Sequence, residues 1–235
     1  MRNQPPKILI TFLVCAAALL LSAVSVSAQC NSERWSVKTG TDADVSLINL
    51  NSTTTTTVAN LTALATPATI PDNTRIKPTE TTVWVMSAAL VKFIRAYDSD
   101  YHMVFADSAG RTMIGEIPDP NCVGAGSPFA AGIAHARAQF DAKFTATQNF
   151  QTVNVPVQIT GVGFFDYQEG QEGIAPNGIE LHPIIDILFN PSFTISSSTP
   201  SLTIARASSA TATITATLSG NFNSAIALSA TGLPA

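Results

Sequence analysis

Runs rich in β-branched and aromatic residues, separated by short polar turns, mark the middle of the chain as a set of β-strands. The first three runs cover residues 81–97, 101–107 and 112–117. The turns between them contain Asp, Ser and Gly, and the short polar side chains among these hydrogen-bond to their own backbone. The pattern therefore predicts three meandering strands.

The spacing of the apolar residues changes after a stretch rich in Pro and Gly at residues 118–128. Apolar side chains then recur at intervals of three or four residues, as on one face of a helix. They are Phe129, Ile133, Ala136, Phe140 and Phe144. Ser127 is a favourable N-cap, and Pro128 suits the first helical position. We expect a helix that packs this stripe into the core and leaves His135 and Arg137 on or beside its solvated face.

Two further strands are predicted over residues 155–167 and 178–189, with a loop that bears Gly and Glu between them. Three strands, a helix and two strands follow one another in the order of the OB arrangement, a five-stranded Greek-key barrel. The expected fold class is mainly β, with one OB-like barrel domain that contains one α-helix and spans residues 79–190.

The segments that flank this domain differ from it in composition. Residues 29–78 are rich in Thr, Ala and Asn, and they predict a loosely structured arm with one or two short strands, one of them near Val45–Leu50. Within this arm, Thr53–Thr57 has high β-propensity but no evident packing partner. Residues 191–235 alternate Thr and Ser with Ile, Leu and Ala at period two, which is typical of β-sandwich strands.

This C-terminal alternation resembles the opening half of the bacterial immunoglobulin-like repeats found on exported proteins. A complete sandwich of that kind needs about seven strands, and only about three fit into residues 191–235. The resemblance implies a truncated immunoglobulin-like repeat, which is an incomplete β-sandwich with exposed edge strands.

Residues 1–28 have the pattern of a secretory signal peptide. Arg2 and Lys7 form a basic start, residues 8–21 form an apolar stretch that is too short for a stable span, and small residues precede Gln29. Cleavage near Ala28 predicts a secreted or periplasmic protein with no membrane span in the mature chain.

Two cysteines remain after such cleavage, Cys30 and Cys122. In an oxidising compartment an even pair predicts a disulfide, and two unpaired thiols are the alternative. A lipid anchor on Cys30 is disfavoured because Gln29 stands where a small residue is expected. The sequence contains no CxxC motif and no Cys/His cluster, so it gives no sign of a structural zinc site.

The charge of the central domain limits its partners. Residues 83–189 contain five basic and eleven acidic side chains. A surface that binds the phosphate backbone of a nucleic acid needs clustered Lys and Arg side chains. Nucleic acid is therefore not an expected partner.

Two short patterns resemble the OB domain of staphylococcal-nuclease-like proteins: the acidic turn at residues 98–101 and the later Asp-Pro pair at residues 119–120. In that family the second turn acid and the later Asp help to hold calcium, and Asp100 and Asp119 are the matching positions. The resemblance implies the barrel fold and offers calcium-dependent phosphodiester hydrolysis as an alternative function. The family's catalytic arginines have no counterparts, since Glu116 stands near the later Asp and residues 145–190 contain no Lys or Arg.

Acidic residues near these turns are the candidate metal ligands. Calcium takes several oxygen ligands, and turn acids two residues apart can converge on one ion. The candidates are Asp98, Asp100 and Asp119, with Asp107 and Glu116 near them in the sequence. Alternatively, these acids hydrogen-bond only to their own turns. No cofactor is expected apart from this possible calcium ion.

Glu180 and His182 are the weak catalytic candidates. On a strand they share one face, while Ile179 and Leu181 point to the core. A carboxylate beside an imidazole raises the imidazole pKa and can act in acid/base chemistry. However, no nucleophile motif such as G-x-S-x-G occurs in the sequence. The favoured alternative is a solvated strand face whose polar pair holds the neighbouring loop against the barrel.

Aromatic residues supply the candidate ligand-binding surface, because OB domains bind oligonucleotides or oligosaccharides across one barrel face with the help of stacking rings. They are Tyr101, His102, Phe165 and Tyr167, with Phe164 beside them. Burial of both phenylalanines at a strand end is the alternative. The favoured function is an exported, non-catalytic binding or interaction module for an unknown extracellular ligand, for which a sugar or peptide is favoured over nucleic acid.

Overall fold

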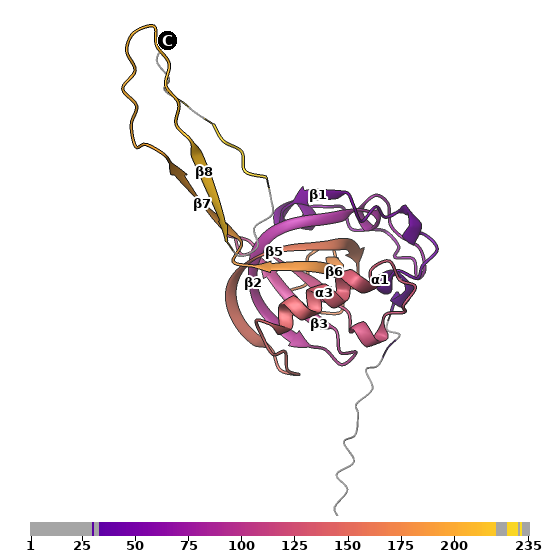
Figure 1. Ribbon diagram of the computed structural model, residues 1–235. Coiled ribbons are helices and arrows are strands. Elements are labelled where there is room, and N and C mark those ends of the chain that lie inside the picture. The colour runs from indigo at the N-terminus through magenta and orange to yellow at the C-terminus, as the bar shows by residue number, and fades with distance from the viewer. Residues whose placement is uncertain (1–29, 31–32, 220–224, 230, 232–235) are drawn as a thin grey trace, which may run out of the picture.

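The computed structural model describes residues 30, 33–219, 225–229 and 231 (Figure 1). The expected signal peptide, residues 1–28, lies outside the described residues. Within them, the protein is mainly β, and none of its helices is long and apolar enough to cross a membrane.

The predicted strands and helix of the central domain are all present. The strands are β2 (Val83–Arg95), β3 (Tyr101–Ala106), β4 (Thr112–Ile117), β5 (Gln151–Phe165) and β6 (Ile179–Phe189), and the helix between β4 and β5 is α3 (Ala130–Asp141). The short elements before them are α1 (Trp35–Thr39), η1 (Val45–Leu47), β1 (Thr53–Thr56), α2 (Val58–Thr62) and η2 (Thr79–Thr81), and η3 (Pro120–Cys122) precedes α3.

One six-stranded sheet contains β1 to β6 in the order β1-β2-β3-β4-β6-β5, and β2 also pairs with β5. From β2 each strand pairs with the next in the order β3, β4, β6 and β5, and β5 pairs again with β2. These five strands therefore form a closed cycle of pairings. Strand β2 has three partners, because β1 pairs with its first residues and β3 with its last, while β5 pairs along most of its length. Its register shifts between Leu90 and Lys92 against both β3 and β5. Such an irregularity bends a strand and increases its twist.

The core lies on one face of these strands and is closed by α3. The predicted helical stripe is confirmed for Ile133, Ala136 and Phe140, which are fully buried, whereas Phe144 lies beyond the end of α3 and is only partly buried. Phe140 packs against Phe93 of β2, with ring centroids 5.1 Å apart. Helix α3 approaches β6 closely at Gly132, where an added Cβ would lie only 2.7 Å from the Cβ of Ile185.

The N-terminal segment differs from the expectation in its elements. Residues Val45–Leu47 form a 3₁₀-helix, so the strand expected near Val45–Leu50 was wrong. The threonine run does have a packing partner: Thr53–Thr56 forms β1, which pairs in parallel with Val83–Met86 of β2. The local pattern could not indicate this partner because it lies about 30 residues further along the chain.

Buried ion pairs fasten this segment to the body. Arg34 donates to both carboxylate oxygens of Glu80, at 2.7 and 3.0 Å. Arg75 is paired with Asp42 at 2.7 Å, and all four of these side chains are fully buried. The segment from Arg34 onward is thus part of the folded body.

Strands β7 (Ser192–Ser197) and β8 (Ile214–Ser219) form a separate two-stranded antiparallel sheet. It projects away from the rest of the molecule (Figure 1). The alternation expected after residue 190 therefore yields strands here, while the larger immunoglobulin-like sandwich stays a prediction.

Candidate functional sites

Ionisable side chains gather on the outer face of β3, β4 and β6. Tyr101, Met103 and Leu181 belong to the hydrophobic core. Because strand side chains alternate, the residues between them point to the opposite face. The ionisable residues of that face are His102 on β3, Glu116 on β4, and Glu180 and His182 on β6.

The parallel register of β4 and β6 brings two of these residues together. Ile114 pairs with Glu180 and Gly115 pairs with Leu181, so Glu116 and His182 are the next residues along the two strands. Asp100 joins them from the residue just before β3. We call Asp100, Glu116 and His182 the buried triad.

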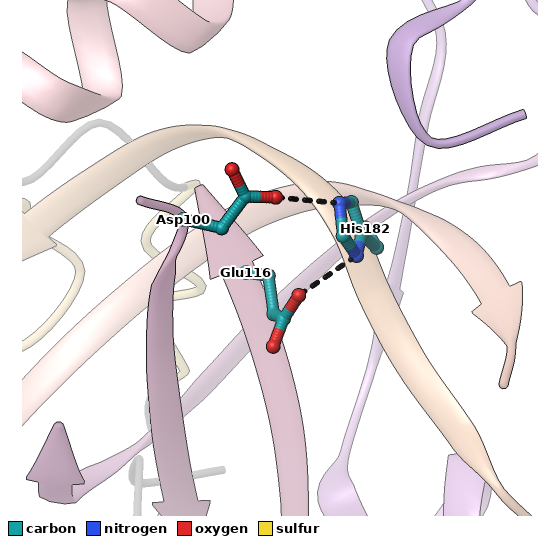
Figure 2. A group of neighbouring side chains, drawn as sticks. All are labelled: Asp100, Glu116 and His182. Carbon is teal, nitrogen blue, oxygen red and sulfur yellow. Dashed lines mark ion pairs between the residues drawn. The ribbon is translucent and has the colours of Figure 1, made fainter. Parts of the chain in front are cut away.

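His182 lies between two carboxylates (Figure 2). Its Nδ1 is 3.2 Å from Oε2 of Glu116, and its Nε2 is 3.7 Å from Oδ2 of Asp100. The side chains of Asp100 and His182 are completely buried, and that of Glu116 is 13% exposed. Three donor groups thus converge in a nearly closed space.

The second oxygen of each carboxylate is held by a neighbour. Oδ1 of Asp100 accepts a hydrogen bond from the backbone N–H of Asp119, at 2.8 Å. Oε1 of Glu116 lies 2.8 Å from Nδ1 of His102, whose Nε2 lies 2.9 Å from the carbonyl oxygen of Glu172. These contacts leave Oδ2 of Asp100 and Oε2 of Glu116 directed toward His182.

Burial and charge set the protonation of the triad. Burial, helped by the nearby charges of Asp98 and Glu116, raises the pKa of Asp100 to about 8. Burial lowers the pKa of His182 to about 3, so this imidazole is neutral at neutral pH and its contacts with the two acids are not ion pairs. Burial alone would raise the pKa of Glu116, but the hydrogen bond from His102 and the charges of His102 and Lys38 lower it to about 2.

His102 differs from His182 in its protonation. Burial opposes its charged form, but the contacts with Glu116 and Glu172 prevail and raise the pKa of His102. Both neighbours are acceptors, so the ring is best matched when both nitrogens carry a proton.

Helix α1 and the loop between β5 and β6 cover this face. Helix α1 contacts β6, and Lys38 of α1 reaches Asp166 of the loop, with 3.4 Å between Nζ and Oδ2. The same loop packs on β3 at Gly173, where an added Cβ would lie 2.4 Å from a methyl group of Val104. The N-terminal segment and this loop thus separate the triad from solvent.

This cover overturns one expectation for Glu180 and His182. Both residues do lie on the face opposite the core, but the solvated strand face expected for them was wrong, since Glu180 is 2% exposed and His182 is 0% exposed. Burial and the charge of Glu116 raise the pKa of Glu180 well above its usual value.

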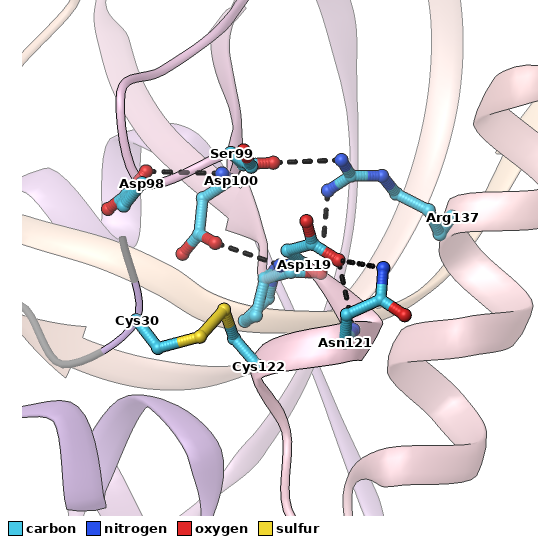
Figure 3. Close-up of a disulfide and its surroundings, with 9 residues drawn as sticks. Cys30, Asp98, Ser99, Asp100, Asp119, Asn121, Cys122 and Arg137 are labelled. Carbon is cyan, nitrogen blue, oxygen red and sulfur yellow. Dashed lines mark hydrogen bonds between the residues drawn. A yellow bond between two sulfur atoms is a disulfide. The ribbon is translucent and has the colours of Figure 1, made fainter. Parts of the chain in front are cut away.

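The acids proposed as calcium ligands serve mainly their own turns (Figure 3). Oδ1 of Asp98 accepts the backbone N–H of Asp100, and Oδ1 of Asp119 accepts the backbone N–H of Asn121. Asp107 likewise bonds to its own turn and to Arg111. Of the three candidates, only Asp100 joins a group of side chains that could hold a metal ion.

The four candidate ligand-binding aromatic residues do not share one exposed face. Tyr101 and Phe165 are part of the core, and the Tyr101 hydroxyl donates to Asp141. His102 lies on the opposite face of β3, beneath the β5–β6 loop. Tyr167 is half-buried and borders a surface hollow together with Arg34 and Glu169.

The expected disulfide is confirmed between Cys30 and Cys122, whose Cα atoms are 5.4 Å apart. It joins the start of the described chain to η3, beside the turn of Asp119 (Figure 3). A disulfide fits an extracellular protein.

The sheet of β7 and β8 is a second candidate site. Its apolar side chains and its hydroxyl side chains lie on opposite faces. On one face Phe193 pairs with Leu218, Ile195 with Ala216, and Ser197 with Ile214. The pairs of the other face contain only Ser and Thr: Ser192 with Ser219, Thr194 with Thr217, and Ser196 with Thr215. Ile195, Ile214 and Leu218 are each about half exposed, at 48%, 47% and 53%.

Sequence reasoning missed the triad as a group. It placed Asp100 and Glu116 in one acidic cluster and His182 in another candidate pair with Glu180, and it did not consider Arg34 or Lys38 at all. The available signal was partial: Glu116 and His182 alternate with core residues of β4 and β6, whereas Asp100 lies in the turn before β3. No protein-family model matches the chain, and neither does any curated protein or solved structure.

Proposed function

We propose that this protein is an exported, non-catalytic interaction module whose body is an OB-like barrel and whose C-terminal strands belong to an immunoglobulin-like segment. The proposed binding surface is the apolar face of the β7–β8 sheet. The observation that carries the proposal is the separation of apolar and hydroxyl side chains onto opposite faces of an exposed sheet.

The strand order supports an OB-like barrel. If the five strands are numbered along the chain from β2, the first pairs with the second, the second with the third, the third with the fifth, the fifth with the fourth and the fourth with the first. Helix α3 lies between the third and fourth strands. That is the connectivity of a five-stranded Greek-key barrel of the OB type. The disulfide and the signal-peptide pattern of residues 1–28 support export.

The exposed sheet supports an interaction role for physical reasons. An isolated two-stranded sheet is only marginally stable in water, and strands at the edge of a sheet have unpaired backbone groups. Contiguous exposed apolar side chains are typical of surfaces that bind other proteins. An apolar face suits an apolar protein surface better than it suits a sugar or a phosphate, so we propose a protein or peptide partner.

Burial of the acid/base candidates supports the non-catalytic part of the proposal. Glu180 and His182 lie beneath α1 and the β5–β6 loop, where a polymeric substrate has no access. The hydrolase alternative is supported by Asp100, which occupies a calcium position of the nuclease-like pattern. Calcium-dependent nicking of plasmid DNA that Asp100→Asn abolishes would establish the hydrolase and contradict the non-catalytic proposal.

The interaction proposal is tested by site-specific photo-crosslinking on the two faces of β7. A photoreactive residue is placed at Ile195 or at the adjacent Thr194, whose side chains point to opposite faces. On the cells that produce the protein, we expect a discrete covalent adduct from position 195 that Leu218→Thr reduces at least tenfold. Equal adducts from both positions, or no adduct at 195, would contradict the proposal.

A further inference from the structure

The described residues contain four buried side-chain polar atoms without a hydrogen-bond partner, and all four lie in or beside the buried triad. They are Oδ2 of Asp100, Oε2 of Glu180, and Nδ1 and Nε2 of His182. Leaving buried polar atoms unsatisfied is costly, and folded proteins rarely do so without a bound water, an ion or a functional reason. Their concentration at one place indicates a ligand that the side chains alone do not supply.

The donor atoms of the triad are close enough to share one ion. One ligand atom each from Asp100, Glu116 and His182 lies within 4.8 Å of the other two. Nitrogen and carboxylate oxygen bind zinc at about 2.0–2.2 Å, so two ligands of one tetrahedral zinc ion are about 3.3–3.6 Å apart. The widest separation in the triad would therefore shorten by up to about 1 Å when the ion binds, through movement of the side chains.

The triad also has the supporting contacts that metal sites require. Metal-binding carboxylates and histidines are oriented by hydrogen bonds from a second layer of residues. Here the backbone N–H of Asp119 holds the outer oxygen of Asp100, and His102 holds the outer oxygen of Glu116. The inner oxygens are thereby fixed in the direction of His182.

The local charge favours a cation. Four acidic groups, Asp100, Glu116, Glu180 and Asp166, lie around two basic ones, Lys38 and His102. Arg34 contributes little further, because its guanidinium already donates to Glu80 and to the backbone carbonyls of Pro71, Thr74 and Phe165. A doubly charged ion can replace protons that its carboxylate ligands carry, because metal ligands must be deprotonated and binding releases those protons.

We propose that Asp100, Glu116 and His182 bind one divalent cation of the zinc class. Imidazole nitrogen suits zinc and the other first-row transition metals, whereas calcium prefers six to eight oxygen ligands. The triad offers one imidazole and two carboxylates in a nearly closed space. This site differs from the acidic cluster considered for calcium, because it adds His182 and lacks Asp98 and Asp119, and it is independent of the interaction proposed for β7 and β8.

The test is metal uptake by the purified, disulfide-bonded protein. After treatment with a chelator, the protein is titrated with zinc by calorimetry, and the bound metal is measured by mass spectrometry. We expect one zinc ion per chain. His182→Gln and Asp100→Asn should each weaken binding by at least tenfold, since even supporting residues of metal sites have effects of 10–100-fold. Calcium, titrated in parallel, should bind at least 100-fold more weakly than zinc.

Two variants serve as matched controls. Asp119→Asn removes a nearby acidic charge but keeps the backbone N–H that holds Asp100, so zinc binding should not change. His135→Gln removes the exposed histidine whose Nε2 lies 3.3 Å from Asp186, a pair that could bind zinc adventitiously. Zinc uptake that depends on His135 and not on His182 would overturn the proposal.

Cobalt provides a measurement that needs no variant at the triad. Cobalt(II) bound by one nitrogen and carboxylate oxygens in a closed site should give visible absorption bands that saturate at one equivalent and that zinc displaces. If His182→Gln or Asp100→Asn fails to fold, the cobalt spectra of the unaltered protein and of His135→Gln still test whether the triad binds a metal ion. Absence of saturable bands, or tight binding of calcium in place of zinc, would overturn the proposal.

Discussion

At the scale of single residues, the buried guanidinium of Arg34 connects the N-terminal segment to the body. Besides the two bonds to Glu80, it donates to the backbone carbonyl of Phe165 at 2.7 Å. Glu80 also accepts the backbone N–H groups of Ile76 and Phe165. One ion pair therefore organises three separate stretches of the chain.

Removal of Arg34 should be strongly destabilising. Arg34→Met leaves the Glu80 carboxylate buried without its partner, and breaking a buried pair in this way costs about 3–5 kcal/mol. The free energy of unfolding from denaturant titration measures the loss. The exposed Arg206→Met should change this free energy by less than about 0.5 kcal/mol. A loss below about 1 kcal/mol for Arg34→Met would show that the pair is not important for stability.

At the scale of elements, the approach of α3 to β6 depends on one glycine. Alanine favours a helix over glycine by about 1 kcal/mol. At Gly132 the added methyl group would meet the Cβ of Ile185 at 2.7 Å and its carbonyl oxygen at 3.3 Å, and neither atom can move without its strand. Packing should therefore outweigh helix propensity at this position.

Gly132→Ala should lower the free energy of unfolding by about 1–3 kcal/mol, which is the usual cost of an overpacked core. The matched control is Gly126→Ala, where an added Cβ would meet nothing within 4 Å. Thermal and denaturant unfolding of both variants provide the comparison. A Gly132→Ala protein as stable as the unaltered one would mean that α3 can shift away from β6.

At the scale of the whole molecule, the disulfide determines how far the N-terminal segment can separate from the body in the unfolded chain. Cys30 and Cys122 are 92 residues apart in sequence. In the chain-entropy model a loop of roughly this length contributes about 4–5 kcal/mol, mainly by restricting the unfolded state.

The double variant Cys30→Ser/Cys122→Ser should therefore unfold with a free energy about 4–5 kcal/mol lower than that of the oxidised protein. Reductant should lower the stability of the unaltered protein by a similar amount and leave the double variant unchanged. If reductant acted equally on both proteins, the effect would not come from this disulfide.

The sequence predicted the elements of the body well and its assembly less well. The helical stripe and the strand runs appear in the pattern because periodicity records which side of an element is buried by the core. The pairing of β1 with β2, the Arg34–Glu80 and Arg75–Asp42 pairs, and the cover over β6 do not appear, because they join residues about 30 or more positions apart.

The candidate sites follow the same division. The shared face of Glu180 and His182 was predictable, since strand geometry alone places residues two apart on one side. Their burial was not, because it depends on the N-terminal segment and the β5–β6 loop. Sequence proximity grouped Asp100 with Asp98, Asp119 and Glu116, whereas the parallel register of β4 and β6 brings His182 into the same group.

The sequence by itself determined the mainly β composition, the helix that covers the core, the cysteine pair and the alternating strands after residue 190, because each of these depends on local periodicity or on residue type. Only the tertiary structure decided which ionisable groups meet and which of them lose contact with water. That outcome depends on strand register and on the segments that cover a strand face, and both are set by contacts between parts of the chain that are remote in sequence.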